Sequence, residues 1–258
     1  MNAVTQANVV EVREPVYVYG SQEYGRHTED SSALAARFHG AEPDCWRGVV
    51  GNSYAIPYRD RAGQRLGAAA LAEQIATFIQ FAKQNPDLRF RIARFGCEPG
   101  AYTDSDMAPL FKAAPSTCVL PALWRRALGT LTTAQVLIFD PMIRLQNADW
   151  LAHLKQYLTV NMPLWGVAKC EFLSIGGARR VSAVAKAAHS FDFKHREIRA
   201  NPHYYGKEAE LASEMLAVWH ATHMLSITDV NQTALPSYMR LATHAIKNGL
   251  VVDDFTLR

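Results

Sequence analysis

Short apolar runs alternate with amphipathic segments along the whole chain. Runs of the kind that form buried strands occupy residues 16–19, 48–57, 90–95, 136–139, 169–175, 193–198 and 224–227. Helical periodicity is found at residues 31–38, 71–84, 104–111, 123–131, 149–158, 182–189, 209–221 and 237–247. Strands that alternate with helices form mainly parallel sheets covered by helices. We therefore expect an α/β protein.

The length and the overall composition favour two domains. A chain of 258 residues exceeds the common size of one domain, and we expect two three-layer αβα domains, at residues 1–121 and 122–258. Hydrophobic residues make up 49% of the chain, yet no apolar run approaches the roughly 18 residues that a membrane span needs. No basic and apolar leader follows Met1. These features predict a cytoplasmic protein that has no membrane partner.

Charge and cysteine content exclude several classes of site. The net charge of +3 does not indicate nucleic-acid binding, although it favours an anionic small molecule in a cleft. The histidines lack a recognised metal-ligand spacing, and we expect neither a metal nor a cofactor. Four cysteines lie far apart without CxxC spacing, so free thiols are expected rather than disulfides or a zinc site: Cys45, Cys97, Cys118 and Cys170.

A glycine follows a strand-like run in each half of the chain. Gly20 and Ser21 come after the first run, and Gly176 and Gly177 come after the run at 169–175. Bare backbone N–H groups at such a turn, just before a helix, hold phosphates in α/β folds. The pattern therefore predicts one nucleotide-type site in each half.

Four stretches of the first half carry a family resemblance: Val18–Ser21, Gly25–His27, Gly51–Pro57, and Phe95–Cys97 leading to Met107–Phe111. On these stretches, residues 15–121 resemble a macro domain, the ADP-ribose-binding fold, and in particular the small macro-like proteins of phages and prophages. The resemblance implies ligand contacts from Gly20, Ser21, Gln22, His27, Gly51, Asn52, Ser53, Gly96, Cys97 and Gly100.

The chain departs from the macro pattern at its phosphate loop and at its catalytic position. Gln22 stands where relatives commonly have asparagine after Gly-Ser, and the acidic, bulky run at 28–30 replaces their glycine-rich loop. Gly100 stands where ester-hydrolysing members carry an acid. Candidate catalytic groups are therefore limited to Glu98, Asp104 and His27.

Residues 170–227 carry a second resemblance, through Gly176–Ala178, the small-residue helix after it, and the stretch 201–207. This part resembles the SLOG superfamily, a Rossmann-like group that binds nucleotides and nucleotide-derived signals. The resemblance implies ligand contacts from Gly176, Gly177, Arg179, Tyr205 and Gly206. Arginines at 179 and 180 replace the acidic residue usual after the glycines, so phosphoribosyl-hydrolase chemistry is not implied.

Several of these residues have a second interpretation. Asn52 and Ser53 either contact a ribose or satisfy the backbone of their turn. Tyr204 and Tyr205 either cover a base or ribose or anchor their loop. Trp150 lies at helical spacing and is expected in the core rather than against a ligand.

Three classes of function follow. The first is a binding protein that senses or sequesters an ADP-ribose-like or cyclic nucleotide, for instance a phage protein that counters host nucleotide signalling. The second is a hydrolase of an ADP-ribosyl or N-glycosidic bond. The third is an interaction module whose clefts are closed. The sequence favours binding over catalysis, and it allows a homodimer through Trp219 or the helix at 237–247.

Overall fold

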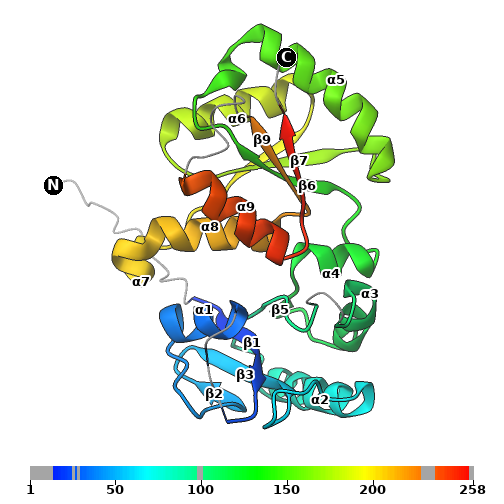
Figure 1. Ribbon diagram of the computed structural model, residues 1–258, viewed down its shortest axis with the longest axis vertical. Coiled ribbons are helices and arrows are strands. Elements are labelled where there is room, and N and C mark those ends of the chain that lie inside the picture. The colour runs from blue at the N-terminus through cyan, green and yellow to red at the C-terminus, as the bar shows by residue number, and fades with distance from the viewer. Residues whose placement is uncertain (1–13, 25–26, 28–29, 98–100, 228–235, 256–258) are drawn as a thin grey trace, which may run out of the picture.

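The computed structural model describes residues 14–24, 27, 30–97, 101–227 and 236–255, and it shows an α/β protein with two mainly parallel sheets. The two units stack along the long axis of the molecule (Figure 1). Helices cover both faces of each sheet, which is consistent with two αβα domains. The expected α/β class is thus confirmed.

The first sheet has the strand order β2-β3-β1-β4-β5. Its strands are β1 (Val16–Gln22), β2 (Gly48–Val50), β3 (Ser53–Arg59), β4 (Phe90–Ile92) and β5 (Cys118–Val119). All neighbouring pairs are parallel except β2 and β3, which form a hairpin. The stretch 48–57, expected as one strand, is this hairpin, because Gly51 turns the chain with a φ of +58°.

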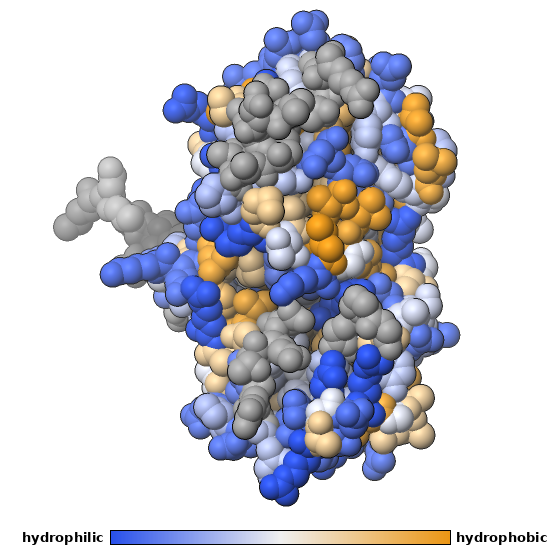
Figure 2. Space-filling model, viewed as in Figure 1, coloured by the Kyte–Doolittle hydropathy of each residue, from blue (hydrophilic) through white to orange (hydrophobic). Residues whose placement is uncertain are grey.

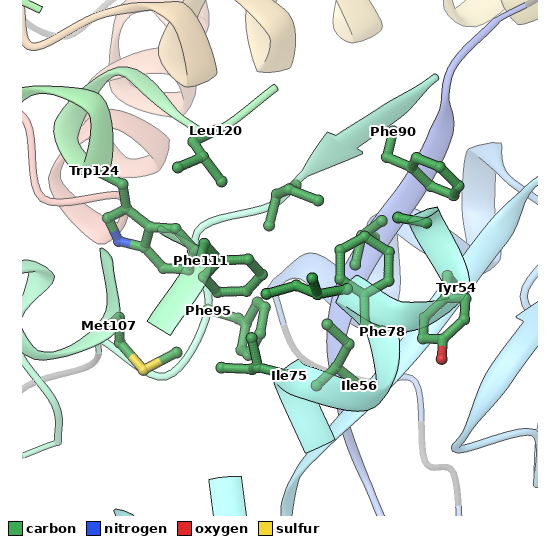
Figure 3. Packing of buried hydrophobic residues seen from close by; sticks show 14 of the residues in the cluster. Tyr54, Ile56, Ile75, Phe78, Phe90, Phe95, Met107, Phe111, Leu120 and Trp124 are labelled. Atoms are coloured by element: carbon green, nitrogen blue, oxygen red, sulfur yellow. The ribbon is translucent and has the colours of Figure 1, made fainter. Parts of the chain in front are cut away.

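Aromatic and aliphatic side chains fill one face of the first sheet. Helix α2 (Ala68–Gln84) buries Leu71, Ile75, Phe78, Ile79 and Ala82, the face that its helical period predicts. The short helices α3 (Asp104–Met107) and η1 (Ala108–Phe111) complete this layer. The core therefore lies between α2, the sheet and the α3–η1 corner (Figure 3).

Helix α4 (Ala122–Ala127) packs with the first core, although its residues were expected in the second domain, 122–258. The ring of Trp124 lies 5.1 Å from Phe111 and 5.9 Å from Phe95, between ring centroids (Figure 3). Its indole N–H donates to Asp104 Oδ1 at 2.8 Å. The connection to the second sheet thus follows α4 instead of preceding it.

The second sheet is entirely parallel, with the strand order β10-β9-β6-β7-β8. Its strands are β6 (Ala134–Phe139), β7 (Cys170–Ser174), β8 (Lys194–Glu197), β9 (His223–Ile227) and β10 (Val251–Phe255). The chain winds outward from β6 to β8 in one direction, and then from β9 to β10 in the other. The apolar pattern predicts no strand after β9, so β10 is an addition.

Two helices cover each face of the second sheet. Helices α5 (Ala148–Leu164) and α6 (Ala178–Ser190) pack on one face, and α8 (Ala209–His220) and α9 (Pro236–Lys247) pack on the other. Two short helices, η2 (Arg144–Gln146) and η3 (Gly206–Glu208), and the turn of helix α7 (Pro202–Tyr205) lie in the connections.

The two units share an interface formed by α7 and α8. Figure 1 shows these helices between the second sheet and helix α1 (Asp30–Phe38) of the first unit. Tyr205 and Ala212 form a small core that Phe38 joins. Arg37 Nε lies 2.6 Å from Glu208 Oε2 across the same interface. The second face of the first sheet is therefore covered by both units.

Candidate functional site

The main candidate site is a cavity at the carboxyl ends of β6, β7 and β8. Its volume is about 530 Å³, within the range of roughly 300–1,000 Å³ that is usual for small-molecule pockets. In open parallel sheets, ligands bind outside the carboxyl ends of the strands. The polar and glycine residues that line the cavity are Asp140, Ser174, Gly176, Gly177, Arg180, Glu197, Arg199, Glu210, Ser213, Glu214 and Ser237.

The amino terminus of α6 opens into this cavity. Gly177 is its N-cap residue and provides no side-chain cap, so the first backbone N–H groups of the helix remain without a side-chain partner there. Gly176 has a φ of +100°, which side chains rarely adopt. A side chain at Gly176 would lie 3.2 Å from Arg180 Nη1, so the guanidinium stands over the glycine turn. The backbone N–H groups at the start of α6 and the guanidinium of Arg180 therefore lie together at the cavity, an arrangement that favours an anion.

Two of the four carboxylates that line the cavity, Asp140 and Glu214, are held by other groups. Both oxygens of Asp140 accept backbone N–H bonds of 2.9 Å, from Arg144 and Leu145, while burial raises the pKa of this carboxyl. Glu214 receives two hydrogen bonds from Arg240, at 2.8 and 2.6 Å.

The pair at the mouth of the cavity is more exposed. Arg199 Nη2 lies 3.1 Å from Glu197 Oε1, and the arginine side chain is 71% exposed. The Glu197 side chain is 35% exposed, so its carboxylate is accessible from solvent.

A serine and a histidine are hydrogen-bonded beneath the cavity. Ser174 Oγ, at the end of β7, lies 2.8 Å from His195 Nε2 on β8. Burial lowers the pKa of His195, against smaller opposite effects of Glu197 and Glu171. Ser174 is 1% exposed, so its hydroxyl is satisfied within the fold. We assign this pair no chemical step.

In the first unit, Gly20 and its neighbours lie inside a strand rather than in a turn. β1 continues through Gln22, and Gly20 pairs with Ile56. A methyl group at Gly20 would lie 2.6 Å from the ring of Phe95, so glycine is needed there for packing. The expected turn after β1 is wrong for this reason. Ser21 Oγ donates to the carbonyl oxygen of Trp46 at 2.5 Å, and Gln22 lies at the end of the strand.

The residues from the third macro-like stretch, Gly51–Pro57, begin at the opposite end of the strands. Gly51, Asn52 and Ser53 stand at the amino end of β3, whereas Gly20 to Gln22 stand toward the carboxyl end of β1. The structure therefore does not bring these two groups together. Ser53 Oγ donates to the carbonyl oxygen of Val50 at 2.6 Å.

Asn52 reaches the interface between the units. Its amide donates to the Pro15 carbonyl oxygen at 3.2 Å and to Tyr204 Oη at 3.3 Å. Tyr205 is buried in the same interface, where its hydroxyl accepts from Arg91 Nη2 at 3.2 Å. Both tyrosines anchor α7 against the first unit, and Gly206 ends that helix with a φ of +53°. Tyr205 also lines a cavity of about 60 Å³ between the units.

The two candidate catalytic residues that the structure describes, Asp104 and His27, are engaged by contacts of the fold. Asp104 accepts from Arg94 Nε at 2.7 Å and from Trp124, which makes it a brace of the α3 corner. His27 Nε2 lies 2.5 Å from the Glu42 carbonyl oxygen. Glu98 lies outside the described residues.

The remaining candidate contacts are Gly96, Cys97, Gly100 and Arg179. Gly96 turns the chain with a φ of +73° after β4, and burial raises the pKa of the neighbouring Cys97 to about 12. Arg179 is exposed on α6 and is absent from the cavity lining, which holds its neighbour Arg180. Gly100 lies outside the described residues. The roles of all these residues as ligand contacts stay predictions.

Several residues of the cavity were not anticipated, namely Ser174, Arg180, Glu197 and Arg199. One signal was available for Arg180, since it stands one helical turn after Gly176 and Gly177. Glu197 ends β8 and Arg199 follows it at the same end of the sheet, but which strands are neighbours cannot be read from a single sequence.

Other features of the described residues bear on the class of protein. All four cysteines are free thiols, as expected. Within the described ranges, no three histidine, cysteine or acidic side chains gather closely enough to hold a metal ion. None of the helices described is both long and apolar enough to cross a bilayer.

The predicted dimer helix shows a mixed surface. Tyr238 of α9 is buried, whereas Met239 and Ile246 of the same helix are more than half exposed. Val251 on β10 is 47% exposed. A hydrophobic patch is visible over the region of α9 and β10 in Figure 2. Trp219 lies at the interface between the units instead. The homodimer stays a prediction.

Comparisons of the chain with protein-family models, with curated proteins and with solved structures find no significant match.

Proposed function

We propose that the protein binds a phosphorylated, nucleotide-derived ligand in the cavity at the carboxyl ends of β6, β7 and β8. The observation that carries the proposal is the uncapped amino terminus of α6, which opens with Gly176 and Arg180 into a cavity of about 530 Å³. The α6 terminus and Arg180 suit a phosphate group. Glu197 and Glu210 supply carboxylate oxygens of the kind that accept from ribose hydroxyls.

The ligand class follows from the size of the cavity and from the resemblances. An ADP-ribose-like molecule or a cyclic nucleotide combines phosphate, ribose and base, and the Rossmann-like resemblance of this half favours such ligands. The outward winding of the sheet from β6 supports that resemblance. The proposal places one ligand cleft in the second unit, because the glycines and polar residues noted in the first unit are engaged by its own packing.

Binding without turnover agrees with the state of two of the four carboxylates that line the cavity, while Glu197 and Glu210 are the groups that the hydrolase alternative would use. A general acid or base must reach the scissile bond with a free oxygen or proton. Asp140 is held by backbone N–H groups and Glu214 by Arg240. Hydrolysis of an ADP-ribosyl or N-glycosidic bond remains the alternative, and a closed interaction module remains the second.

A thermal-shift panel with product analysis separates the three. The purified protein is heated with ADP-ribose, NAD, cyclic ADP-ribose isomers and cyclic dinucleotides, and each mixture is then examined by chromatography. Ligand at 100 times its Kd stabilises a fold by about 2.7 kcal/mol. A melting shift with intact ligand supports binding, and released product indicates the hydrolase. An unchanged melting temperature with every compound, and no product, contradicts the proposal and favours the interaction module.

A further inference from the structure

Two aromatic side chains and two arginines form a row at the carboxyl end of β1 and β3 in the first sheet. Tyr24 follows β1 and Arg61 follows β3, while Trp46 and Arg47 precede β2, which runs antiparallel to β3. Arg61 Cζ lies 4.3 Å from the centroid of the Tyr24 ring. The centroids of Tyr24 and Trp46 are 6.1 Å apart, and Arg47 Cζ lies 6.0 Å from that of Trp46. We call these four residues the aromatic–arginine row.

The side chains of the aromatic–arginine row are open to solvent. Tyr24 is 51% exposed, Arg47 and Arg61 are exposed, and Trp46 is half-buried. Arg47 donates to Gln74 Oε1, and Arg61 lies against the Tyr24 ring. Neither arginine forms an ion pair with a residue that the structure describes. A ligand can therefore reach both cations without displacing a carboxylate from them.

The acidic residues nearest in sequence are not paired with the row. Glu23, Asp44 and Asp60 form no ion pair with its arginines in the described part of the chain. Asp60 Oδ1 accepts from the backbone N–H of Gln64 at 2.8 Å. Because these carboxylates still lower the positive potential around the row, we expect few phosphate contacts and a weak dependence of binding on salt.

The backbone holds the row in place. Tyr24 has a φ of +66°, which a bulky residue rarely adopts. Strain of this kind persists where the surrounding structure imposes it, and it is common at ligand-binding sites. Ser21 Oγ donates to the Trp46 carbonyl oxygen, and Gln22 Nε2 donates to that of Arg61 at 3.5 Å. The end of β1 therefore fixes the segments that carry the other members of the row.

Aromatic faces beside unpaired arginines suit a nucleobase beside a phosphate. Bases stack on aromatic rings and on guanidinium planes, and phosphate oxygens accept from guanidinium groups. Single-stranded nucleic acid repeats an accessible base and a phosphate in every unit, whereas the bases of a duplex are stacked on one another. The net charge of +3 could not indicate such a surface, because it sums the whole chain while the row joins three separate segments.

We propose that the aromatic–arginine row binds single-stranded nucleic acid, with bases against Tyr24 and Trp46 and phosphates at Arg47 and Arg61. This site goes beyond the proposed function. None of the four residues lines the cavity at β6, β7 and β8, and the row takes a polymer rather than a free nucleotide-derived ligand.

Fluorescence anisotropy with labelled oligothymidine and oligouridine of about 15 nucleotides tests the proposal. Wild type is expected to bind both strands at least tenfold more tightly than a duplex of the same length. Two phosphate contacts predict a slope of about −1.4 for the logarithm of the binding constant against that of the salt concentration. Arg61→Gln is expected to reduce this slope by about 0.7, since it removes one contact.

Tyr24→Gly separates the ring from the fold. Glycine adopts a φ of +66° without strain, so this variant is expected to melt close to wild type. Loss of one stacked base is expected to weaken binding roughly 5- to 150-fold. Two matched variants, Arg89→Gln on an exposed residue of the first unit and Arg180→Gln in the nucleotide cavity, are expected to bind the strands as wild type does.

Four results would overturn the proposal. They are no binding of either strand by wild type, equal affinity for the duplex, unchanged affinity in Tyr24→Gly, and displacement of the strand by polyglutamate as readily as by unlabelled strand. The last would show a general surface for anions. Loss of strand binding in Arg180→Gln but not in Tyr24→Gly would place the strand in the cavity instead. Binding of free nucleotides there, whether found or not, leaves these outcomes unchanged, so the two proposals fail separately.

Discussion

Trp219 of α8 donates its indole N–H to the backbone carbonyl oxygen of Ile92 at 2.6 Å, which ties a helix of the second unit to a strand of the first. Ile92 ends β4, and both its neighbour Arg91 and Trp219 line the small cavity between the units. The two sheets are therefore connected through a buried contact and not only through the chain that follows α4.

Trp219→Phe is expected to destabilise the protein while keeping an aromatic ring at the interface. The change leaves the Ile92 carbonyl oxygen without its donor, which costs about 1–3 kcal/mol. Urea unfolding followed by circular dichroism measures the free energy of unfolding. Trp150→Phe, far from the interface, is the matched control. Equal losses in both variants would show that the hydrogen bond contributes nothing of its own.

Gly20→Ala is expected to destabilise the first unit by overpacking. The new methyl group meets the Phe95 ring at 2.6 Å, and such strain costs about 1–3 kcal/mol. Phe95→Leu makes room, so the double variant is expected to lose less than the sum of the two single losses. A double-mutant cycle by urea unfolding checks this. Simple additivity would contradict the packing role of Gly20.

The free energy of unfolding is expected to fall with decreasing pH already at pH values well above those at which carboxylates usually titrate. Burial, and less strongly Arg91, lowers the pKa of His39 to about 3, and burial also lowers the pKa values of His223 and His244 to about 4. In the unfolded chain these rings take up a proton near pH 6.5. The unfolded state therefore binds more protons below that pH, and stability falls as the pH decreases from 6.5 toward 4.

The size of this effect is testable at one ring. Each such histidine contributes up to about 1.4 kcal/mol per pH unit below 6.5. His39→Phe keeps the stacking on Tyr17, at 4.5 Å between ring centroids, but cannot titrate. Its stability is expected to fall less steeply between pH 6 and about 4.5, by urea unfolding at each pH. His203→Gln, on an exposed residue, keeps the wild-type slope. A slope for His39→Phe equal to that of wild type would argue against a neutral His39.

Three of the four thiols are expected to react slowly in the folded protein. Burial raises the pKa of Cys97 and Cys170 to about 12 and that of Cys118 to about 11, so almost no thiolate is present at pH 8. Iodoacetamide labelling with peptide mass mapping is expected to modify these cysteines over hours in buffer and within minutes in urea. Rapid labelling in buffer would contradict their burial.

Helical periodicity and apolar runs were sufficient to locate most elements. The pattern at 71–84 predicts α2, because its five buried side chains recur with the helical period. β10 was missed, since Val251–Phe255 holds two aspartates and is an edge strand with little apolar content. The inclusion of α4 in the first core was also missed, because a buried tryptophan does not indicate which sheet it packs against.

The site was predictable where it depends on local sequence. Gly176 and Gly177 stand between a strand and a helix that are adjacent in the chain, and the structure places them at the cavity. Asn52 and Tyr204 could not be placed, because their contact joins residues 152 positions apart across two units. Glycine is typical of turns, so Gly20 was expected in one. In the structure it lies within β1, where the ring of Phe95, distant in sequence, leaves no room for a side chain.

The most direct test of phosphate binding at the α6 terminus is titration calorimetry with ADP-ribose, on wild type and on variants of two neighbouring arginines. If the thermal-shift panel selects another nucleotide, that compound is used in place of ADP-ribose. Arg180→Gln is expected to weaken binding at least tenfold, since Arg180 stands over the glycine turn of the cavity. Arg179→Gln, outside the cavity lining, is expected to bind as wild type does. Unchanged affinity in Arg180→Gln, or loss in Arg179→Gln alone, would contradict the position of the phosphate at the α6 terminus.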